Sequence, residues 1–413
     1  MRFILPLLTA ITLAIAPVRF DREKVLHVKP DEKQANIIKD LAKTNQLDFW
    51  HPDITHHVAA NMTVDFRISE KEFQSIQAAF DQNRMHYEIL IHDVQEEVEK
   101  QFDVKEDIPG RHSYAKYNNW DEIVATEKMV HKHPKMVSRI KIGTTVEDNP
   151  LYVLKIGEKD ERRKAIFMDC GIHAREWISP AFCQWFVYRA TKTYGKNKIM
   201  TKLLDRMNFY VLPVFNVDGY IWSWRQDRMW RKNRSKNQRS KCIGTDLNRN
   251  FNVSWNSFPH TKDPRREIYG GPAPESEKET KAVTDFIGSH RKSIKAYLTF
   301  HSYSQMLLFP GYTSELPPNH EELAKVAKIG TDVLSTQYEP LHTCGPTAST
   351  IYPTSGSSLD WAYNLGIKHT FAFELRDKGK FSFLLPESQI KSTCKETMLA
   401  VEFIVKYILK HTS

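Results

Sequence analysis

The residues best suited to chemistry lie in the segment Gly171–Trp177, which reads GIHAREW. His173 and Glu176 stand three positions apart there, directly after an apolar run that predicts a strand. Imidazole nitrogen and carboxylate oxygen both bind zinc, and a catalytic zinc site uses three protein ligands and an open position. His301, after a second apolar run, is the candidate third ligand. The pair alone is a weak signal, because 17 histidines and 50 acidic residues will produce such spacings by chance.

Four groups that could form this site each follow an expected strand. The groups are His173, Glu176, His301 and Glu374, and the strands span 165–168, 296–300 and 370–373. Ligands of open α/β sheets bind at the carboxyl ends of strands, so these side chains are expected to meet. His301 alone could be an ordinary buried histidine, and Glu374 could simply pair with Arg376. The joint placement favours a zinc hydrolase.

The elements that would position these groups alternate between strand and helix after residue 107. A further strand is expected at 209–213, and helices at 181–194, 277–290, 321–338 and 396–410. Ser179 and Pro180 are typical of a helix start, as a capping residue and a first-turn proline. The alternation predicts an α/β domain with a largely buried sheet.

Residues 17–107 have a different character. They hold 12 Lys and Arg against 19 Asp and Glu, whereas residues 108–413 hold 46 against 31, so a net charge of −7 precedes one of +15. Strands are expected at 24–29, 58–68 and 87–91, and helices at 31–47, after Ser69 with Glu72 completing a capping box, and at 93–104. This pattern predicts a small α+β domain. The basic remainder favours polyanionic partners.

The N-terminus narrows the choice of partner. Met1–Phe3 is short and basic, residues 4–16 are an apolar run too short to span a bilayer, and Ala14–Ala16 fits signal-peptide cleavage. No other run approaches about 18 uninterrupted apolar residues, so no membrane span is expected. A signal peptide at 1–16 predicts secretion, which argues against nucleic acid as a partner and favours sulfated glycans.

Cysteines and sequons agree with a secretory route. Five cysteines allow at most two internal disulfides and leave one cysteine over. Asn-X-Ser/Thr sequons begin at Asn61, Asn233 and Asn252, although many sequons go unused.

Several motifs together resemble those of the pancreatic-type (A/B) zinc metallocarboxypeptidases. They are HAREW at 173–177, WRKNRS at 230–235, GTDLNRNF at 244–251, LTFHSYSQ at 298–305, STIYPTSGSSLDW at 349–361 and FAFELRD at 371–377. The resemblance covers nearly the whole chain. It implies a catalytic domain at 108–413 with a mixed, twisted central sheet flanked by helices. It also implies a small α+β open-sandwich pro-domain at 17–107 that covers the active site of a zymogen.

The resemblance also implies roles for single residues. His173, Glu176 and His301 would hold one Zn²⁺. Glu374 would be the general base, and Arg231 would stabilise the developing oxyanion. The substrate contacts would be Asn248 and Arg249 on the C-terminal carboxylate, Tyr352 as a mobile cap over it, and Arg175 and Tyr303 as secondary contacts. The substrates would be peptide and protein C-termini.

Specificity is expected to follow from Leu359, which precedes Asp360-Trp361. In the resembling family this position lies at the base of the pocket for the C-terminal side chain, and an acidic residue there selects Lys and Arg. Leucine, with Thr354 nearby, implies aromatic and large aliphatic side chains instead.

The chain also departs from the family pattern. Cys170 and Cys183 match a disulfide of some relatives, but Cys242 lacks its usual partner and is either free or paired with Cys344; Cys394 has no assigned partner. The loop at Pro310-Gly311 is one residue short, which weakens the specificity prediction. The expected mature start at Ile108 follows Glu106-Asp107, which implies activation by a non-tryptic protease.

Two functional classes compete for this sequence. One is a secreted exopeptidase, stored in secretory granules, whose basic surface also binds heparin-like sulfated glycans. The other is a glycan-binding relative that has lost catalysis. Intact Glu374, Arg231 and zinc ligands favour the enzyme.

Overall fold

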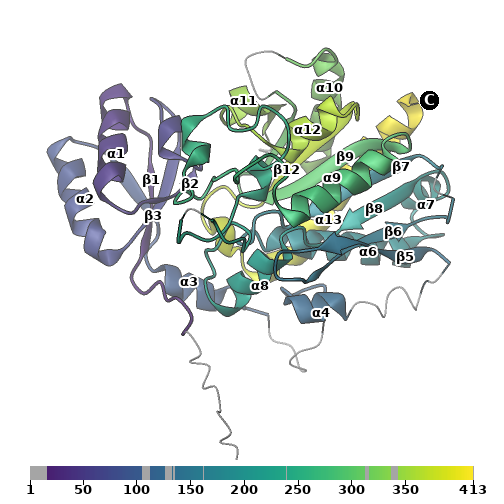
Figure 1. Cartoon of the computed structure of the whole chain (residues 1–413), viewed down its shortest axis with the longest axis horizontal. Helices are drawn as coiled ribbons and strands as arrows, with labels where there is room; N and C mark the ends of the chain where they lie inside the picture. Colours follow the sequence, from purple (N-terminus) through teal and green to yellow (C-terminus); the bar gives the residue numbers. More distant parts are fainter. Residues whose placement is uncertain are drawn as a thin grey trace, which may run out of the picture.

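The structure, a computed structural model, describes residues 16–104, 112–125, 133, 135–160, 162–238, 240–311, 316–335 and 343–412. Two sheets organise the chain, a four-stranded sheet in an N-terminal domain and an eight-stranded sheet in a larger C-terminal domain (Figure 1). The expected signal peptide, apart from Ala16, and the expected boundary after Asp107 lie outside the described residues.

The N-terminal domain is an antiparallel sheet in the order β2-β3-β1-β4 with two helices against one face (Figure 1). Its elements are β1 (Lys24–Val28), α1 (Glu32–Thr44), β2 (Asp48–His51), β3 (Val64–Ile68), α2 (Glu70–Gln82), β4 (Tyr87–Ile91) and α3 (Val94–Lys100). Successive strand side chains point to opposite faces. Leu26 therefore packs with the helices, whereas Val25 joins a cluster with Met229 and Phe383 of the C-terminal domain. The expected α+β sandwich is confirmed.

The sequence located most of these elements. β4 has the expected bounds, and Ser69 and Glu72 form the expected capping box of α2. The expected strand at 58–68 is half wrong, because only Val64–Ile68 is a strand and a 3-10 helix, η1 (Thr55–His57), precedes it. β2 has only four residues, too few to give a periodic signal.

The C-terminal domain contains a mixed sheet in the order β11-β10-β12-β9-β7-β8-β6-β5. Its strands are β5 (Val137–Thr144), β6 (Pro150–Ile156), β7 (Ala165–Cys170), β8 (Asn208–Leu212), β9 (Ile294–Ser302), β10 (Met306–Phe309), β11 (Thr343–Pro346) and β12 (His369–Leu375). The four central strands, β12, β9, β7 and β8, run parallel. Antiparallel pairing of β8 with β6 and of β12 with β10 makes the sheet mixed, as expected.

Helices cover both faces of this sheet (Figure 1). They are α4 (Trp120–Val124), α6 (Ile178–Thr193), α7 (Lys198–Leu204), α8 (Val217–Arg225), α9 (Lys278–His290), α10 (His320–Ser335), α11 (Thr347–Thr350), α12 (Ser358–Asn364) and α13 (Ile390–His411). Side chains of α6, α7, α10 and α13 share one core with the sheet, and those of α9 and α12 share a second core on its other face. The central strands are therefore buried on both sides, which leaves their carboxyl ends to build a site.

The start of α6 corrects one expectation. Ser179 does not cap this helix, because α6 begins at Ile178 after Trp177 and no side chain caps it. The Ser179 hydroxyl instead accepts a hydrogen bond from Gly171 N and donates to the Phe300 carbonyl. A residue with a capping signature thus joins α6 to the ends of β7 and β9.

Candidate metal centre and substrate cleft

His173, Glu176 and His301 converge near the carboxyl ends of β7 and β9. His173 Nδ1 lies 2.7 Å from Glu176 Oε1, and His301 Nδ1 lies 3.2 Å from Glu176 Oε2 and 3.3 Å from His173 Nδ1. All three side chains are buried. Burial would raise the pKa of Glu176, but the two imidazoles hold that pKa well below its usual value. Two imidazoles and a carboxylate arranged in this way fit the donor set of a catalytic zinc site.

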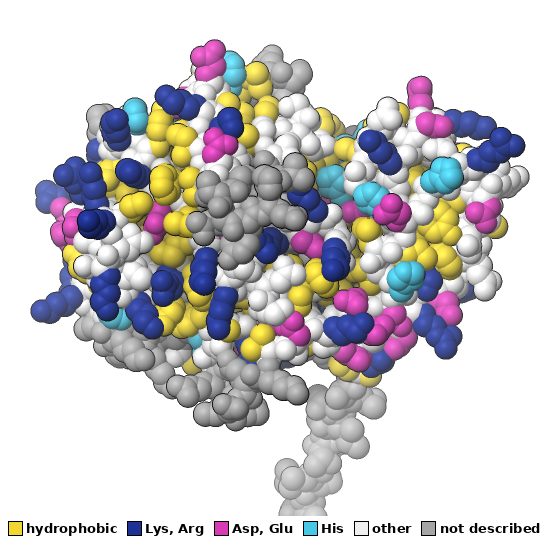
Figure 2. Space-filling model, turned by 180° about the vertical axis from the view of Figure 1, so that it is seen from behind, with side chains coloured by type: hydrophobic (Ala, Val, Ile, Leu, Met, Phe, Trp, Pro, Cys, Tyr) yellow, Lys and Arg dark blue, Asp and Glu magenta, His cyan; other side chains and the backbone are white. Residues whose placement is uncertain are grey.

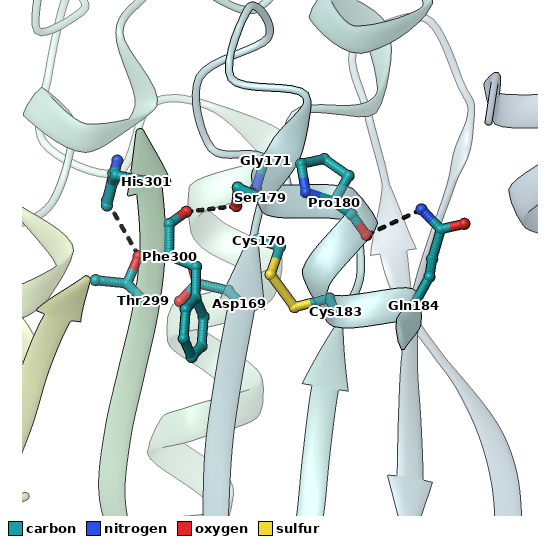
Figure 3. The surroundings of a disulfide bond; sticks show 10 residues. All are labelled: Asp169, Cys170, Gly171, Ser179, Pro180, Cys183, Gln184, Thr299, Phe300 and His301. Carbon is teal, nitrogen blue, oxygen red and sulfur yellow. Dashed lines mark hydrogen bonds between the residues drawn. A yellow bond between two sulfur atoms is a disulfide. The ribbon is translucent and has the colours of Figure 1, made fainter. Parts of the chain in front are cut away.

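The second nitrogen of each imidazole has a polar neighbour. His173 Nε2 lies 3.2 Å from Asp246 Oδ1. Thr299 Oγ1 donates to Asp169 at 2.8 Å, so the same oxygen accepts from His301 Nε2 at 3.2 Å (Figure 3). A proton on His301 Nε2 leaves the Nδ1 lone pair available to a metal ion, in place of the contact with Glu176. Thr299 therefore favours the tautomer that metal binding requires.

The loop that carries two of the ligands is fastened at both ends. Cys170 before it and Cys183 in α6 form the disulfide that the resemblance implied (Figure 3). The Ser179 hydroxyl adds its two hydrogen bonds beside this link. Gly171 has a φ of +68°, and an added Cβ would lie 2.8 Å from Pro180, so glycine is required at this turn.

Glu374 lies in β12, and its partner in the parallel pair with β9 is His301. The residue is half-buried and lines the same cavity as the ligands. Loss of hydration raises the pKa of Glu374 to about 8. A cation held by the neighbouring ligands would favour the ionised form, which can accept a proton.

Two buried arginines form the cationic side of the cavity. Arg231 donates from Nε and Nη2 to Asp246 Oδ2, at 3.1 and 2.9 Å. Arg249, at the end of η2 (Leu247–Arg249), donates to Asp53 Oδ2 at 2.5 Å, and Arg231 Nη2 lies 3.5 Å from the same oxygen. Burial opposes both charges, but the two carboxylates raise the pKa of each guanidinium above its usual value. Asn248 lies beside Arg249, and its Oδ1 accepts from Ser358 N.

Asp53 belongs to the N-terminal domain, which also contacts three other expected substrate-binding residues. The pairs are Tyr303 OH with Asp65 Oδ2 at 2.8 Å, Arg175 Nη1 with Asp48 Oδ1 at 3.2 Å, and the Tyr352 ring stacked on His57 with centroids 4.5 Å apart. Trp50 adds an edge contact to Phe383 at 5.0 Å. The N-terminal domain therefore occupies the mouth of the cleft.

Ten of the eleven predicted site residues line one cavity. They are His173, Glu176, Arg231, Asn248, Arg249, His301, Tyr303, Tyr352, Leu359 and Glu374. Arg175 is not among its lining residues, and its guanidinium packs over Phe383, which does line the cavity. Leu359, which also lines the cavity, forms a buried cluster with Leu308 and Ala372.

Sequence reasoning missed several residues of this cleft. Asp246 lies inside the motif GTDLNRNF, so its position was available even though its contacts were not. Asp48, Asp53, His57 and Asp65 carry no local signal, because their partners lie more than 100 positions away.

The fold also shows whether the remaining cysteines pair and which sequons are exposed. Cys242, Cys344 and Cys394 are free among the described residues, so pairing of Cys242 with Cys344 is wrong. Asn233 is buried and donates to Glu277 at 2.7 Å, whereas Asn61 and Asn252 are exposed.

Comparisons with known proteins agree with this architecture. Residues 123–400 match the family described as zinc carboxypeptidase, and residues 26–101 match the carboxypeptidase activation peptide. The chain is 82% identical to mast cell carboxypeptidase A of Homo sapiens over 417 aligned positions, with all of both chains covered. It is 50% identical to carboxypeptidase B of Bos taurus, with 98% of each covered. The crystal structure of thrombin activatable fibrinolysis inhibitor superposes with a TM-score of 0.90 at 41% identity, covering 95% of this chain and 100% of that one.

Proposed function

Because the chain belongs to the zinc carboxypeptidase family, we propose that it removes aromatic or large aliphatic residues from peptide C-termini. One observation carries this proposal: the candidate zinc ligands, the arginine pair and Leu359 line a single cavity. A guanidinium pair suits a terminal carboxylate, and an apolar pocket suits an uncharged side chain.

The proposed reaction assigns one task to each group. Arg249 and Asn248 bind the substrate's terminal carboxylate, and Tyr352 covers it. His173, Glu176 and His301 would hold a zinc ion, which would polarise the scissile carbonyl and lower the pKa of a bound water. Glu374 accepts a proton from the attacking water and delivers it to the leaving amine. Arg231 stabilises the negative charge that develops on the carbonyl oxygen. Arg175 and Tyr303 contact substrate residues further from the C-terminus.

The N-terminal domain is proposed to act as an inhibitory pro-domain at residues 17–107, ahead of a catalytic domain at 108–413. The Asp53 carboxylate, 2.5 Å from Arg249, stands where the substrate's terminal carboxylate is expected to bind. Substrate and Asp53 would therefore compete for one guanidinium. Release of the pro-domain by cleavage near residue 107 would vacate the cleft, and the acidic sequence there calls for a non-tryptic protease.

Hydrolysis of matched peptides ending in Phe, Leu and Arg tests the proposed function. The mature enzyme should hydrolyse the first two and lose activity with a zinc chelator. Preferred release of Arg would overturn the specificity, and full activity in chelator would overturn the metal chemistry. The rival class, a glycan-binding relative without catalysis, predicts no hydrolysis of any of the three.

We also propose secretion and granule storage after removal of residues 1–16. The Cys170–Cys183 disulfide supports an oxidising compartment. Within the described part of the chain, no helix is long and apolar enough to cross a membrane. Retention of the unprocessed N-terminus in a secreting cell would contradict this route.

A specific surface supports sulfated glycans as partners of the C-terminal domain. Figure 2 shows Lys and Arg side chains spread over the back of this domain. Lys196, Lys198, Lys202 and Arg206 are exposed and line one shallow groove at α7. Surface cations of this kind attract polyanions, and salt weakens the attraction. The pair Lys198→Glu and Lys202→Glu should lower the salt needed to elute the mature enzyme from heparin, and unchanged elution would exclude this groove.

A further inference from the structure

The pocket that would receive the substrate's C-terminal side chain is not purely apolar. Its wall is the buried cluster of Leu308, Leu359 and Ala372, with Ile351 packed against it. Thr347, Thr354, Ser357 and Ser358 line the same cavity. We call this end of the cavity the side-chain pocket.

Two of the four hydroxyls are already hydrogen-bonded within the protein, and a third is fully buried. Thr347 Oγ1 donates to the Phe309 carbonyl at 3.1 Å. Ser357 Oγ donates to Asp360 Oδ2 at 2.5 Å. Ser358 is fully buried beside Tyr297, and its Oγ has no hydrogen-bond partner among the described residues. Thr347 and Ser357 are therefore committed to bonds within the protein, and Ser358 is shut away from the cavity by its burial.

Thr354 combines an unpartnered hydroxyl with residual exposure, whereas Ser358 has no exposure. It is 8% exposed, and its Oγ1 has no hydrogen-bond partner among the described residues. A buried hydroxyl without a partner is unfavourable, and most such groups in folded proteins are paired. A hydroxyl that lines a binding pocket and lacks a protein partner is therefore available to a ligand.

We propose that Thr354 Oγ1 hydrogen-bonds the phenolic hydroxyl of a C-terminal tyrosine, so that the enzyme prefers tyrosine to phenylalanine. This inference rests on the proposed function, since it concerns the same pocket. A tyrosine ring can pack against the wall of Leu308, Leu359 and Ala372. Its hydroxyl can both donate a hydrogen bond to threonine and accept one from it. The described carboxylates that line the cavity are Asp53, Glu176 and Glu374, which the proposed function assigns to the arginines, the metal and proton transfer, so a cationic side chain would lack a free partner here.

The preference for tyrosine arises because binding of a C-terminal phenylalanine is unfavourable for Thr354. A bound phenylalanine would seal Thr354 Oγ1 from water without giving it a partner. A bound tyrosine pairs the same atom. The difference corresponds to one hydrogen bond between neutral groups, which is about a tenfold preference in kcat/KM.

Matched peptides ending in Tyr, Phe, Leu and Arg test the proposal on the mature enzyme. We expect a Tyr-to-Phe ratio of kcat/KM of about ten, which falls to about one in Thr354→Val and is retained in Thr354→Ser. Thr347→Val is the matched control, because it removes a hydroxyl that is already bonded to backbone, and its ratio should stay near the wild-type value.

The outcomes separate this inference from the proposed function. Equal release of Tyr and Phe by the wild type, or an unchanged ratio in Thr354→Val, overturns the role of Thr354 while hydrolysis of Phe and Leu still supports the proposed function. Preferred release of Arg overturns both. A Thr354→Val variant whose melting temperature matches that of the wild type shows that the chain has kept its fold.

Discussion

The two ends of the cleft are built on opposite principles. At the metal and arginine end, Arg231 and Arg249 each lie against carboxylates, and one of these, Asp53, comes from the N-terminal domain. At the side-chain pocket, apolar residues form the wall, and the Thr354 hydroxyl has no hydrogen-bond partner among the described residues. A buried unpaired charge costs far more than an unpaired hydroxyl. The N-terminal domain therefore supplies a carboxylate, Asp53, in place of the substrate's terminal carboxylate. It does so beside the arginines, where an unpaired buried charge would be most unfavourable.

The difference between the two ends predicts two kinds of mutational effect. Changes at the metal and arginine end should lower the hydrolysis of all substrates alike. Changes in the side-chain pocket should reorder substrates.

Glu374→Gln should have the largest effect. It removes the proposed proton acceptor while preserving shape, so kcat should fall about 10²- to 10⁴-fold for peptides ending in Phe, Leu or Tyr. Zinc content, measured by metal analysis, should not change, because Glu374 is outside the ligand set. Near-normal turnover in this variant would sink the proposed mechanism.

Arg249→Gln should come next, with kcat/KM reduced roughly 10²-fold for every free C-terminus. The physical reason is loss of the charge-assisted bond to the terminal carboxylate. The loss should be the same for Phe and Leu peptides. A loss confined to one of them would mean that the two ends of the cleft are not separate.

Asp53→Asn tests whether the Asp53 carboxylate blocks the arginines in the zymogen. Without its charge the N-terminal domain no longer neutralises Arg249 and Arg231, so residual activity of the intact zymogen on a short peptide should rise about 10- to 100-fold. Asp81→Asn changes an exposed carboxylate of the same domain and should leave this activity unchanged. Equal behaviour of the two variants would argue against Asp53 as the block.

Leu359→Asp should reorder substrates. A carboxylate at the base of the side-chain pocket would favour a cationic side chain, so the Arg-to-Phe ratio of kcat/KM should rise at least tenfold. The comparison uses the same peptides and needs no absolute rate. If the variant keeps the wild-type ranking, Leu359 does not face the substrate side chain.

The smallest expected effect is a pH dependence of the zymogen. His57 stacks on Tyr352 and is near Asp53, Arg249 and His56. Burial lowers the pKa of His57 from 6.5 to about 4. As pH falls from 6.5 toward 4, the undocked domain therefore binds a proton that the docked domain does not, and docking weakens, by about tenfold at pH 5.5.

Zymogen activity on a short peptide, compared between pH 7.5 and 5.5 and normalised to the mature enzyme, measures this shift. His57→Phe keeps an aromatic ring against Tyr352 but cannot titrate, so it should flatten the dependence. A dependence that persists in this variant would assign the effect to other groups.

Strands and helices were predicted correctly from the sequence where the apolar pattern was long and differed clearly from its surroundings. β7, β9 and β12 were found because long apolar runs mark strands buried on both faces. β5 and β6 were missed, since their partly exposed side chains dilute the apolar signal. The start of α6 was wrong because Ser179 has a capping residue's chemistry but bonds Gly171 and Phe300 instead.

The sequence by itself determined which chemical groups the protein has and, through ordered motifs, that ten of them line one cleft. It also predicted Cys170 and Cys183 as a disulfide pair. Only the tertiary structure decided that Asp53 neutralises Arg249, that His57 covers Tyr352 and that the Thr354 hydroxyl has no hydrogen-bond partner among the described residues. The reason is physical: periodicity is local along the chain, whereas desolvation and hydrogen-bond pairing depend on neighbours that folding brings from distant positions.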